Sequence, residues 1–230
     1  MNEKVAAVIL AAGSGSRMKM DITKQRLTIL GKSVLRRTAE AFDACGRVSS
    51  ITVVVRGDEV DFAEKELHGI GKLKNIVIGG QTRPESARIG FLSLSDSADY
   101  VAIHDAARCL VTPSMIESVI NDAIRYGAAT ASSRITDTVK ICDGEDVIRS
   151  TLDRRELRLV QTPQVFRCDL YSRALLAAGE FDDRITDDNM LLERIGIKIY
   201  CTDTGKRNIK ITEKEDALLA EFLIINGENA

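Results

Sequence analysis

Two glycines and two cations follow the first apolar run of the chain. The run from Val5 to Leu10 leads directly into the segment Ala11 to Met18, which carries Gly13, Gly15 and Arg17, and Lys24 follows. Glycines let backbone N–H groups come close to an anion, and the two cations add positive charge. This combination predicts a loop that binds phosphate groups.

Three other interpretations of this loop have to be weighed. A dinucleotide-binding loop needs a third glycine, and Met18 stands at that position. A Walker loop needs Gly-Lys-Ser or Gly-Lys-Thr, and neither occurs here. An ordinary glycine turn remains open, but two cations beside the core favour an anion site.

Polar clusters also follow two later β-prone runs. The first, Gly79 to Ala87, leads into a helical pattern, so its backbone is suited to an anion, although most such segments are turns. The second contains His104, Asp105 and Arg108. Asp105 could bind a ribose hydroxyl or a metal ion, or it could cap a helix or pair with Arg108. His104 alone is more typical of a structural histidine.

Five weaker polar motifs are spread over the second half of the chain. Each is, taken singly, more typical of a solvated surface than of a site. They are Asp137-Thr138, Asp153-Arg154, Gln161 to Gln164, Thr186 to Asp188, and Asn208 to Thr212.

The elements that must position these residues alternate between strands and helices. Short apolar runs predict buried strands, and apolar positions at helical spacing predict helices between them. This βαβ alternation predicts an α/β fold with a doubly wound, mostly parallel sheet in a single domain over residues 1–230. The predicted strands are Val5 to Leu10, Ile51 to Val55, Asn75 to Ile78, Tyr100 to Ile103, Ala128 to Ser132 and Ile197 to Cys201. The predicted helices include Val34 to Phe42, a helix opened by Thr112-Pro113, Asp169 to Ala178, Asp187 to Ile195 and Glu213 to Ile225.

The alternation is interrupted at residues 134–152. Two β-prone runs, Thr136 to Ile141 and Val147 to Thr151, flank the turn Asp143-Gly144-Glu145. They predict a β-hairpin arm that protrudes from the main sheet. An isolated two-stranded ribbon is marginal in water, so we expect a second copy to cover it in a two-fold homodimer.

Composition excludes several classes of protein. The net charge of -2 gives no broad basic field for nucleic acid, and aromatic residues make up only 4% of the chain. Five cysteines without a CxxC pair favour neither a disulfide framework nor a zinc site. No apolar stretch is long enough for a membrane span or a signal peptide. We therefore expect a cytoplasmic protein that contacts neither nucleic acid nor membrane.

Taken together and in order, the motifs resemble the methylerythritol phosphate cytidylyltransferases over about residues 5–225. The resemblance rests on LAAGSGSRM with KQ, GGQTRPES, HDAAR, DT, DR, QTPQ, TD and NIKIT. It implies a Rossmann-like nucleotidyltransferase fold whose arm builds a homodimer. It also implies transfer of a cytidylyl group from CTP to 2-C-methyl-D-erythritol 4-phosphate, with Mg²⁺ as cofactor.

The resemblance also implies roles for individual residues. Arg17 and Lys24 match a catalytic pair that stabilises the transition state, and Arg154 and Lys210 are counted with them as catalytic. The residues implied to bind the nucleotide are Ala11, Ala12, Gly13, Ser14, Gly15, Gly80, Arg83, Ser86, Asp105 and Ala106. Those implied to bind the alcohol phosphate are Arg108, Thr138, Arg154, Thr162 and Lys210, and the resemblance implies that Thr138 reaches the site of the neighbouring subunit. No metal ligand is assigned, apart from Asp105 as a possible contact.

The chain departs from the family pattern at four positions. Arg26 stands where an aromatic residue is usual, and Cys109 where proline is usual. Arg158 and Asn189 also differ from the common residues. A cytidylyltransferase for another polyol phosphate, such as ribitol 5-phosphate, is the main alternative, although Ala12 and the DR and TD motifs favour the methylerythritol enzyme. A non-catalytic nucleotide-binding module and an NAD-dependent oxidoreductase are further alternatives.

Overall fold

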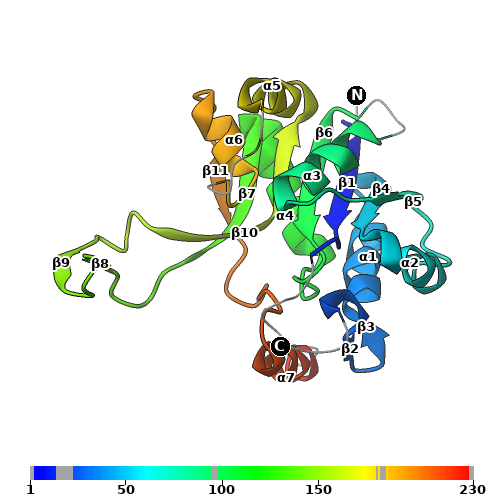
Figure 1. Cartoon of the computed structure of the whole chain (residues 1–230), viewed down its shortest axis with the longest axis horizontal. Helices are drawn as coiled ribbons and strands as arrows, with labels where there is room; N and C mark the ends of the chain where they lie inside the picture. The colour runs from blue at the N-terminus through cyan, green and yellow to red at the C-terminus, as the bar shows by residue number, and fades with distance from the viewer. Residues whose placement is uncertain (1–2, 14–22, 95–97, 180, 182–184, 228–230) are drawn as a thin grey trace.

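The computed structural model describes residues 3–13, 23–94, 98–179, 181 and 185–227. Its centre is a seven-stranded sheet (Figure 1). In spatial order the strands are β11 (Tyr200–Asp203), β7 (Ala128–Arg134), β10 (Arg158–Arg167), β6 (Tyr100–Asp105), β1 (Val5–Leu10), β4 (Val48–Val55) and β5 (Leu73–Ile78). β10 runs antiparallel to both of its neighbours, and the other pairs are parallel. The prediction of a mostly parallel α/β sheet is confirmed.

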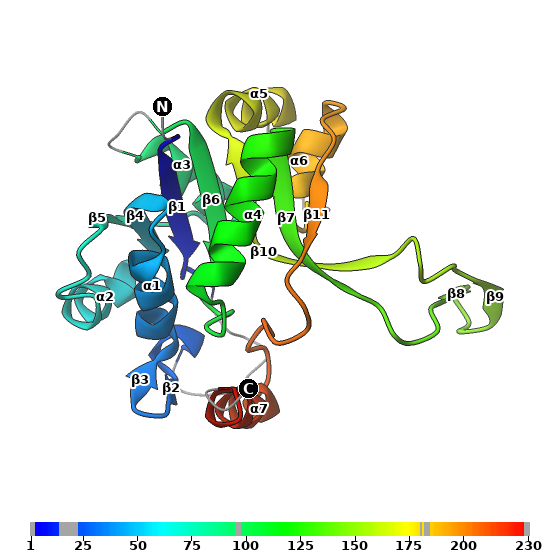
Figure 2. The same ribbon diagram turned by 180° about the vertical axis from the view of Figure 1, so that it is seen from behind.

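Helices cover both faces of the sheet because the side chains of each central strand alternate between two cores. In β1, Val5, Ala7 and Ile9 belong to one core, and Val8 and Leu10 belong to the other. The first core packs against α1 (Val34–Ala44), α2 (Val60–Glu66) and α4 (Pro113–Tyr126). Of these, α1 and α4 lie in front of the sheet in Figure 2. The second packs against α3 (Arg83–Leu92), α5 (Cys168–Ala178) and α6 (Asn189–Arg194).

Local signals set both bounds of α4, and its start is the predicted one. The Thr112 hydroxyl accepts a hydrogen bond from the Met115 N–H, and Pro113 is the first residue of the helix. Gly127 ends the helix with φ of 89°, a left-handed conformation that favours glycine. The buried side chains of α4 are Ile116, Val119, Ile120 and Ala123, which belong to the predicted apolar stripe.

Smaller elements lie at the carboxyl edge of the parallel strands. They are the 3₁₀ turns η2 (Lys24–Arg26) and η3 (Gly57–Glu59), the strands β2 (Thr28–Ile29) and β3 (Lys32–Ser33), and α7 (Lys214–Ile225). A third apolar cluster, which includes Ile29, Val34, Ile211 and Ala220, joins this group to the domain. The last helix, red in Figure 1, thus lies close to the strand ends.

The predicted hairpin is present as an arm between β7 and β10. Its strands, β8 (Lys140–Cys142) and β9 (Ile148–Thr151), are shorter than predicted, and both views show the arm projecting away from the sheet (Figures 1 and 2). The Asp143 carboxylate accepts hydrogen bonds from the N–H groups of Glu145 and Val147 and so fixes the turn. Apolar side chains of the arm are exposed, namely Ile141, Val147, Ile148 and Leu152.

Three predicted features of the second half need correction. The sequence interpretation did not assign β10 as a strand, because its buried middle part is polar. The strand predicted at Ile197 to Cys201 is β11, which lies at Tyr200–Asp203, and the helix predicted from Asp187 begins at Asn189. The β10 polar side chains are buried because they hydrogen-bond inside the domain, which apolar periodicity cannot reveal.

Candidate active site

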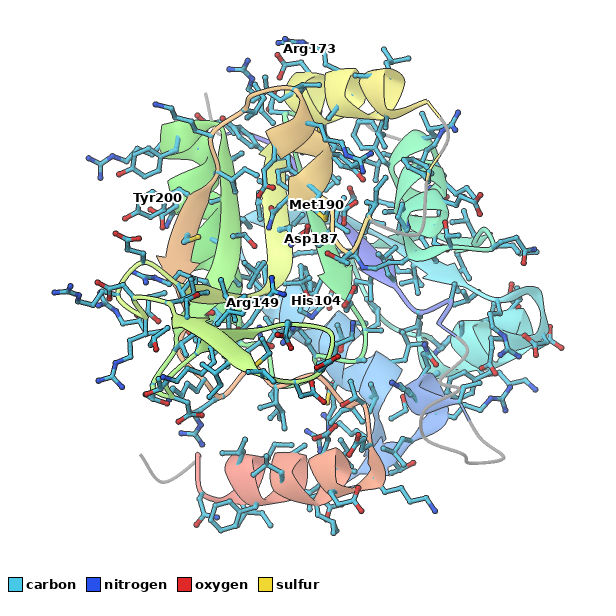
Figure 3. The ribbon with its side chains drawn as sticks, turned by 60° about the vertical axis from the view of Figure 1, so that its left-hand side comes forward. His104, Arg149, Arg173, Asp187, Met190 and Tyr200 are labelled. Carbon is cyan, nitrogen blue, oxygen red and sulfur yellow. The ribbon has the colours of Figure 1, made fainter. Side chains whose placement is uncertain are left out.

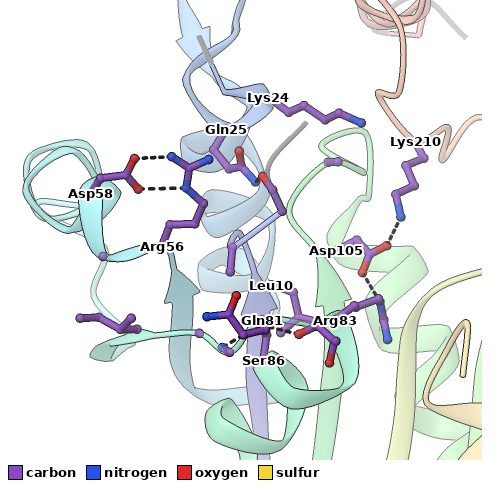
Figure 4. A pocket seen from close by; sticks show the side chains of 18 residues that line it. Leu10, Lys24, Gln25, Arg56, Asp58, Gln81, Arg83, Ser86, Asp105 and Lys210 are labelled. Carbon is purple, nitrogen blue, oxygen red and sulfur yellow. Dashed lines mark hydrogen bonds and ion pairs between the residues drawn. The ribbon is translucent and has the colours of Figure 1, made fainter. Parts of the chain in front are cut away.

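A cavity of about 740 Å³ opens at the carboxyl ends of β1, β4, β5 and β6 (Figure 4). Open α/β sheets bind ligands at this edge, and the volume suits a small organic ligand. Ionisable side chains from widely separated parts of the sequence line it, among them Lys24, Arg83, Asp105 and Lys210.

Asp105 at the end of β6 lies between two cations. Its Oδ1 is 3.1 Å from Arg83 Nε, and its Oδ2 is 2.6 Å from Lys210 Nζ, as the dashed lines in Figure 4 mark. Burial by itself would raise the pKa of Asp105, but the charges of Arg83 and Lys210 outweigh burial and lower it. Asp105 is therefore a carboxylate throughout the physiological pH range.

The Arg83 guanidinium has a second anionic partner. Its Nη1 lies 2.6 Å from Oδ2 of Asp188, and the Tyr171 hydroxyl donates to the other Asp188 oxygen at 2.7 Å. Burial alone would lower the pKa of Arg83, but the carboxylates of Asp188 and Asp105 raise it. Burial, followed by the charge of Asp188, raises the pKa of the Tyr171 phenol. A series of polar contacts thus leads from the core to the cavity, through Tyr171, Asp188, Arg83, Asp105 and Lys210.

A second hydrogen-bond network, on the core side, holds the backbone of Asp105. The Asp105 N–H donates to the Thr162 hydroxyl at 3.1 Å, and that hydroxyl lies 3.0 Å from Nδ1 of His104. The Arg108 carbonyl lies 3.3 Å from Nε2 and can only accept, so a neutral imidazole carries its proton on Nε2, and its Nδ1 accepts from the Thr162 hydroxyl. Burial lowers the pKa of His104 to about 3. His104, labelled inside the domain in Figure 3, is a structural histidine.

Arg108 is a largely buried cation that has no described carboxylate within ion-pair distance. Its Nη1 donates to the Asn208 carbonyl at 2.8 Å, whereas its Nε is buried and makes no hydrogen bond. Burial lowers the pKa of Arg108. A buried donor on a cation is costly to leave unpaired, so this side chain is suited to an anionic ligand.

Two glycines form the wall beside α3. A methyl group on Gly79 would lie 2.7 Å from the Ser86 hydroxyl and 2.8 Å from the Ala12 methyl, and one on Gly80 would meet the Glu85 side chain. The Glu85 carboxylate accepts hydrogen bonds from the N–H groups of Gln81 and Thr82. The expectation that this helix start is suited to an external anion is therefore wrong, because the chain's own carboxylate already occupies it.

The cavity gathers eight of the residues predicted for the site. They are Ala12, Gly13, Lys24, Gly80, Arg83, Ser86, Asp105 and Lys210. Ala11 and Ala106 are buried beneath it, where their N–H groups donate to the carbonyls of Val54 and Leu10 and join the strand ends. Ser14, Gly15 and Arg17 lie outside the described residues.

Two predicted substrate residues lie elsewhere in this chain. Thr138 and Arg154 are exposed on the arm, and Arg154 donates to the backbone carbonyl of Thr136. Both views show that the arm leads away from β1, β4 and β5 (Figures 1 and 2). Neither residue is among those that line the cavity with Lys210. The substrate role of Arg154 and the role of Thr138 in a neighbouring subunit's site therefore remain predictions.

Sequence reasoning missed one wall of the cavity. Arg56 and Asp58 form an ion pair after β4 (Figure 4). Because they closely follow a predicted strand, the rule that ligands bind at strand ends could have identified them. Their types alone gave no signal, since charged residues after a strand are usually solvated.

Within the described segments, no group of three or more His, Cys, Asp or Glu side chains could hold a metal ion. Both oxygens of Asp105 already face cations. The described residues therefore do not fit a protein-held magnesium site. Along the same segments, no helix combines the length and apolar character needed to cross a membrane.

Comparison with known proteins matches almost the whole chain. The family model described as 2-C-methyl-D-erythritol 4-phosphate cytidylyltransferase matches residues 5–226. The enzyme of that name from Pelotomaculum thermopropionicum is 40% identical over 96% of this chain and 94% of its own length. That from Clostridium acetobutylicum is 38% identical over 95% and 96%, respectively. The crystal structure of 4-diphosphocytidyl-2C-methyl-D-erythritol synthase from Anaerococcus prevotii is similar with a TM-score of 0.85 at 28% identity, covering 97% of this chain and 99% of that chain.

Proposed function

The chain belongs to the 2-C-methyl-D-erythritol 4-phosphate cytidylyltransferase family, and on that premise we propose how its residues carry out the reaction. The enzyme transfers the cytidylyl group of CTP to 2-C-methyl-D-erythritol 4-phosphate. A substrate phosphate oxygen forms a bond to the α-phosphorus of CTP, and the bond between that phosphorus and the oxygen bridging to the β-phosphate breaks. The products are 4-diphosphocytidyl-2-C-methyl-D-erythritol and pyrophosphate.

The observation that supports this reaction best is the position of Asp105, fixed between Arg83 and Lys210 on the cavity floor. Two carboxylates, Asp105 and Asp188, offset the charges of the two cations. The floor is therefore nearly neutral and suits the hydroxyl-rich nucleoside better than the triphosphate. Lys24, which lines the same cavity, is placed to meet the phosphate groups.

The chemistry requires no general base from the protein. A phosphate monoester has a second pKa near 6, so its oxygen is already largely ionised at neutral pH. The main difficulty is to bring two polyanions together and to stabilise the charge that develops at phosphorus. Lys24 and Arg17 stabilise that charge, Lys210 and Arg108 bind the substrate phosphate, and Thr162 supports the site by holding the Asp105 backbone and the His104 ring.

We further propose a metal ion, a partner and a cellular location for the enzyme. A Mg²⁺ ion bound to CTP would be held largely by phosphate oxygens and water and would offset part of the triphosphate charge. Two copies form a homodimer through the arm at residues 134–152, and each arm brings Thr138 and Arg154 to the other copy's cavity. The protein works in the cytoplasm.

The test is release of pyrophosphate from CTP and Mg²⁺ with a panel of polyol phosphates. We expect release with methylerythritol phosphate and little with ribitol 5-phosphate or erythritol 4-phosphate. Faster turnover of ribitol 5-phosphate would overturn the substrate assignment. Binding of CTP without turnover of any polyol phosphate would overturn the transferase assignment.

A further inference from the structure

Asp188 is a buried carboxylate next to the site that does not itself line the cavity. It is 1% exposed, and its Oδ2 lies 2.6 Å from Arg83 Nη1. Arg83 is the first residue of α3, and its guanidinium reaches from there to both Asp188 and Asp105. The direction of this guanidinium is thus set by two carboxylates on opposite sides.

Three elements hold Asp188 in place. Besides Arg83 in α3, the Tyr171 hydroxyl in α5 donates to Asp188 Oδ1 at 2.7 Å. The Asp188 N–H donates to Oε1 of Gln164 in β10 at 3.0 Å. Gln164 in turn donates from Nε2 to Asp187 at 2.8 Å. The Tyr171 ring stacks on Phe166, with ring centroids 5.4 Å apart. Because each bond comes from a different element, the carboxylate has little freedom to rotate.

The position of Asp188 determines how many hydrogen bonds Arg83 makes to Asp105. With Asp188 present, Arg83 offers one nitrogen to each carboxylate, and the second oxygen of Asp105 stays available to Lys210. Without the Asp188 charge, the guanidinium has one anion left within reach. A fork of N–H groups then favours a bidentate pair with Asp105, in competition with Lys210.

We propose that Asp188 is a positioning residue, which acts on the nucleotide only through Arg83 by keeping Asp105 shared between Arg83 and Lys210. This inference rests on the proposed function, because it concerns the affinity of the same cavity for CTP. In Asp188→Asn, the side chain keeps its shape and one oxygen. We expect the KM for CTP to rise by about tenfold or more, the effect of losing a hydrogen bond to a charged group, with a smaller change in kcat.

A double-mutant cycle distinguishes positioning from general support of the fold. In an Arg83→Met background, Asp188→Asn should cause no further rise in the KM for CTP, because the residue through which it acts is gone. Independent effects that multiply would overturn the proposal. Tyr171→Phe, which removes one holding bond, should raise the KM in the same direction by a smaller factor.

Asp187→Asn is the matched control. It changes the neighbouring carboxylate, which contacts Gln164 and Asn189 at the start of α6 and lies near Met190 in Figure 3. We expect a KM for CTP within about twofold of the wild type because, among the described contacts, the Asp187 side chain reaches Asp188 only through Gln164 and makes no ion pair with Arg83. If Asp187→Asn and Asp188→Asn lower the melting temperature and raise the KM equally, the effect is structural and the proposal is wrong.

Calorimetric titration with CTP, in the absence of the second substrate, measures the dissociation constant of CTP for each variant. The double-mutant cycle can then be repeated with these constants in place of KM. A wild-type protein that binds CTP but transfers nothing would refute the proposed reaction and still leave the cycle measurable. An unchanged dissociation constant in Asp188→Asn would refute the positioning role, whatever the outcome of the transferase assay.

Discussion

Arg26 and Glu59 form an ion pair, with Nε 3.0 Å from Oε2, that joins two turns in the wall of the cavity. Arg26 ends η2, which contributes Lys24 and Gln25 to the lining, and Glu59 ends η3. The Arg26 guanidinium also lies 4.5 Å from the centre of the Phe62 ring. This part of the wall therefore combines an ion pair with a cation packed on an aromatic ring from α2.

Replacing Arg26 by Met should lower the free energy of unfolding by about 1 kcal/mol, since Arg26 is partly exposed whereas Glu59 is left buried without its cation. Urea denaturation measures the change. Adding Glu59→Gln should recover most of the loss. Lys32→Met, which breaks an exposed pair with Glu40, is the control and should have almost no effect. A loss in Arg26→Met that the second substitution does not recover would show that the ion pair is not its cause.

His104 should make the protein less stable as the pH falls. Its pKa in the folded state is about 3, against 6.5 for an ordinary histidine, so between these values the unfolded chain binds a proton that the folded protein does not. Stability due to this group is therefore complete above pH 6.5 and falls with decreasing pH, by up to about 1.4 kcal/mol per pH unit. The chain has two histidines, so a His68→Gln variant leaves one imidazole to follow by NMR. A shift of its ring signals between about pH 7 and pH 5 would contradict the neutral buried ring.

Gly79→Ala and Gly13→Ala should differ sharply. A methyl group on Gly79 meets Ser86, Ala12 and Val54 at 2.7 to 3.0 Å, whereas one on Gly13 has nothing within 4 Å. The first substitution should cost about 2 kcal/mol of stability, and the second less than about 0.5 kcal/mol. If Gly13→Ala folds normally but weakens CTP binding, the ligand itself approaches this glycine. Equal stability of the two variants would contradict the close packing at Gly79.

Lys24→Met should lower kcat by on the order of 10²-fold, as the loss of a transition-state donor does in other enzymes. Lys24 is 8% exposed and lines the cavity, and methionine retains the length of its apolar stem. Steady-state kinetics with CTP and methylerythritol phosphate separate kcat from KM. A rise in the KM for CTP at unchanged kcat would mean that Lys24 binds the substrate and its transition state equally.

Composite sites can be tested by mixing two inactive variants. Arg154→Ala removes a cation from the arm, and Lys210→Met removes one from the cavity. If each arm serves the other copy, a mixed dimer has one site with both defects and one intact site. Co-refolding equal amounts should therefore restore about a quarter of the wild-type activity, because half of the dimers are mixed and each has one working site. No recovery, with mixed dimers shown by mass spectrometry, would place both residues in one copy's site.

The elements that apolar patterns specify were predictable from the sequence. β1 and α4 follow from their apolar positions and caps, and the rule for strand ends brings Asp105 and Gly80 into one cavity. The pairing of charges was not predictable. With 32 basic and 34 acidic residues in the chain, nothing local indicates that Arg83 meets Asp188. β10 escaped detection for a related reason, because its buried glutamines and threonine are satisfied only by partners that the fold brings to them.

The positions of the paired charges along the chain determine when the site can form during synthesis. Arg83 and Asp105 lie in the first half, and their partners Asp188 and Lys210 each follow 105 residues later. The strands β1, β4, β5 and β6 can associate on the ribosome well before Lys210 emerges, because parallel neighbours among them are all supplied by residue 105. Until then Asp105 lies at the end of β6 without its Lys210 partner. A chain truncated before Asp188 therefore has the strands β1, β4, β5 and β6 but lacks both Asp188 and Lys210 at the nucleotide site.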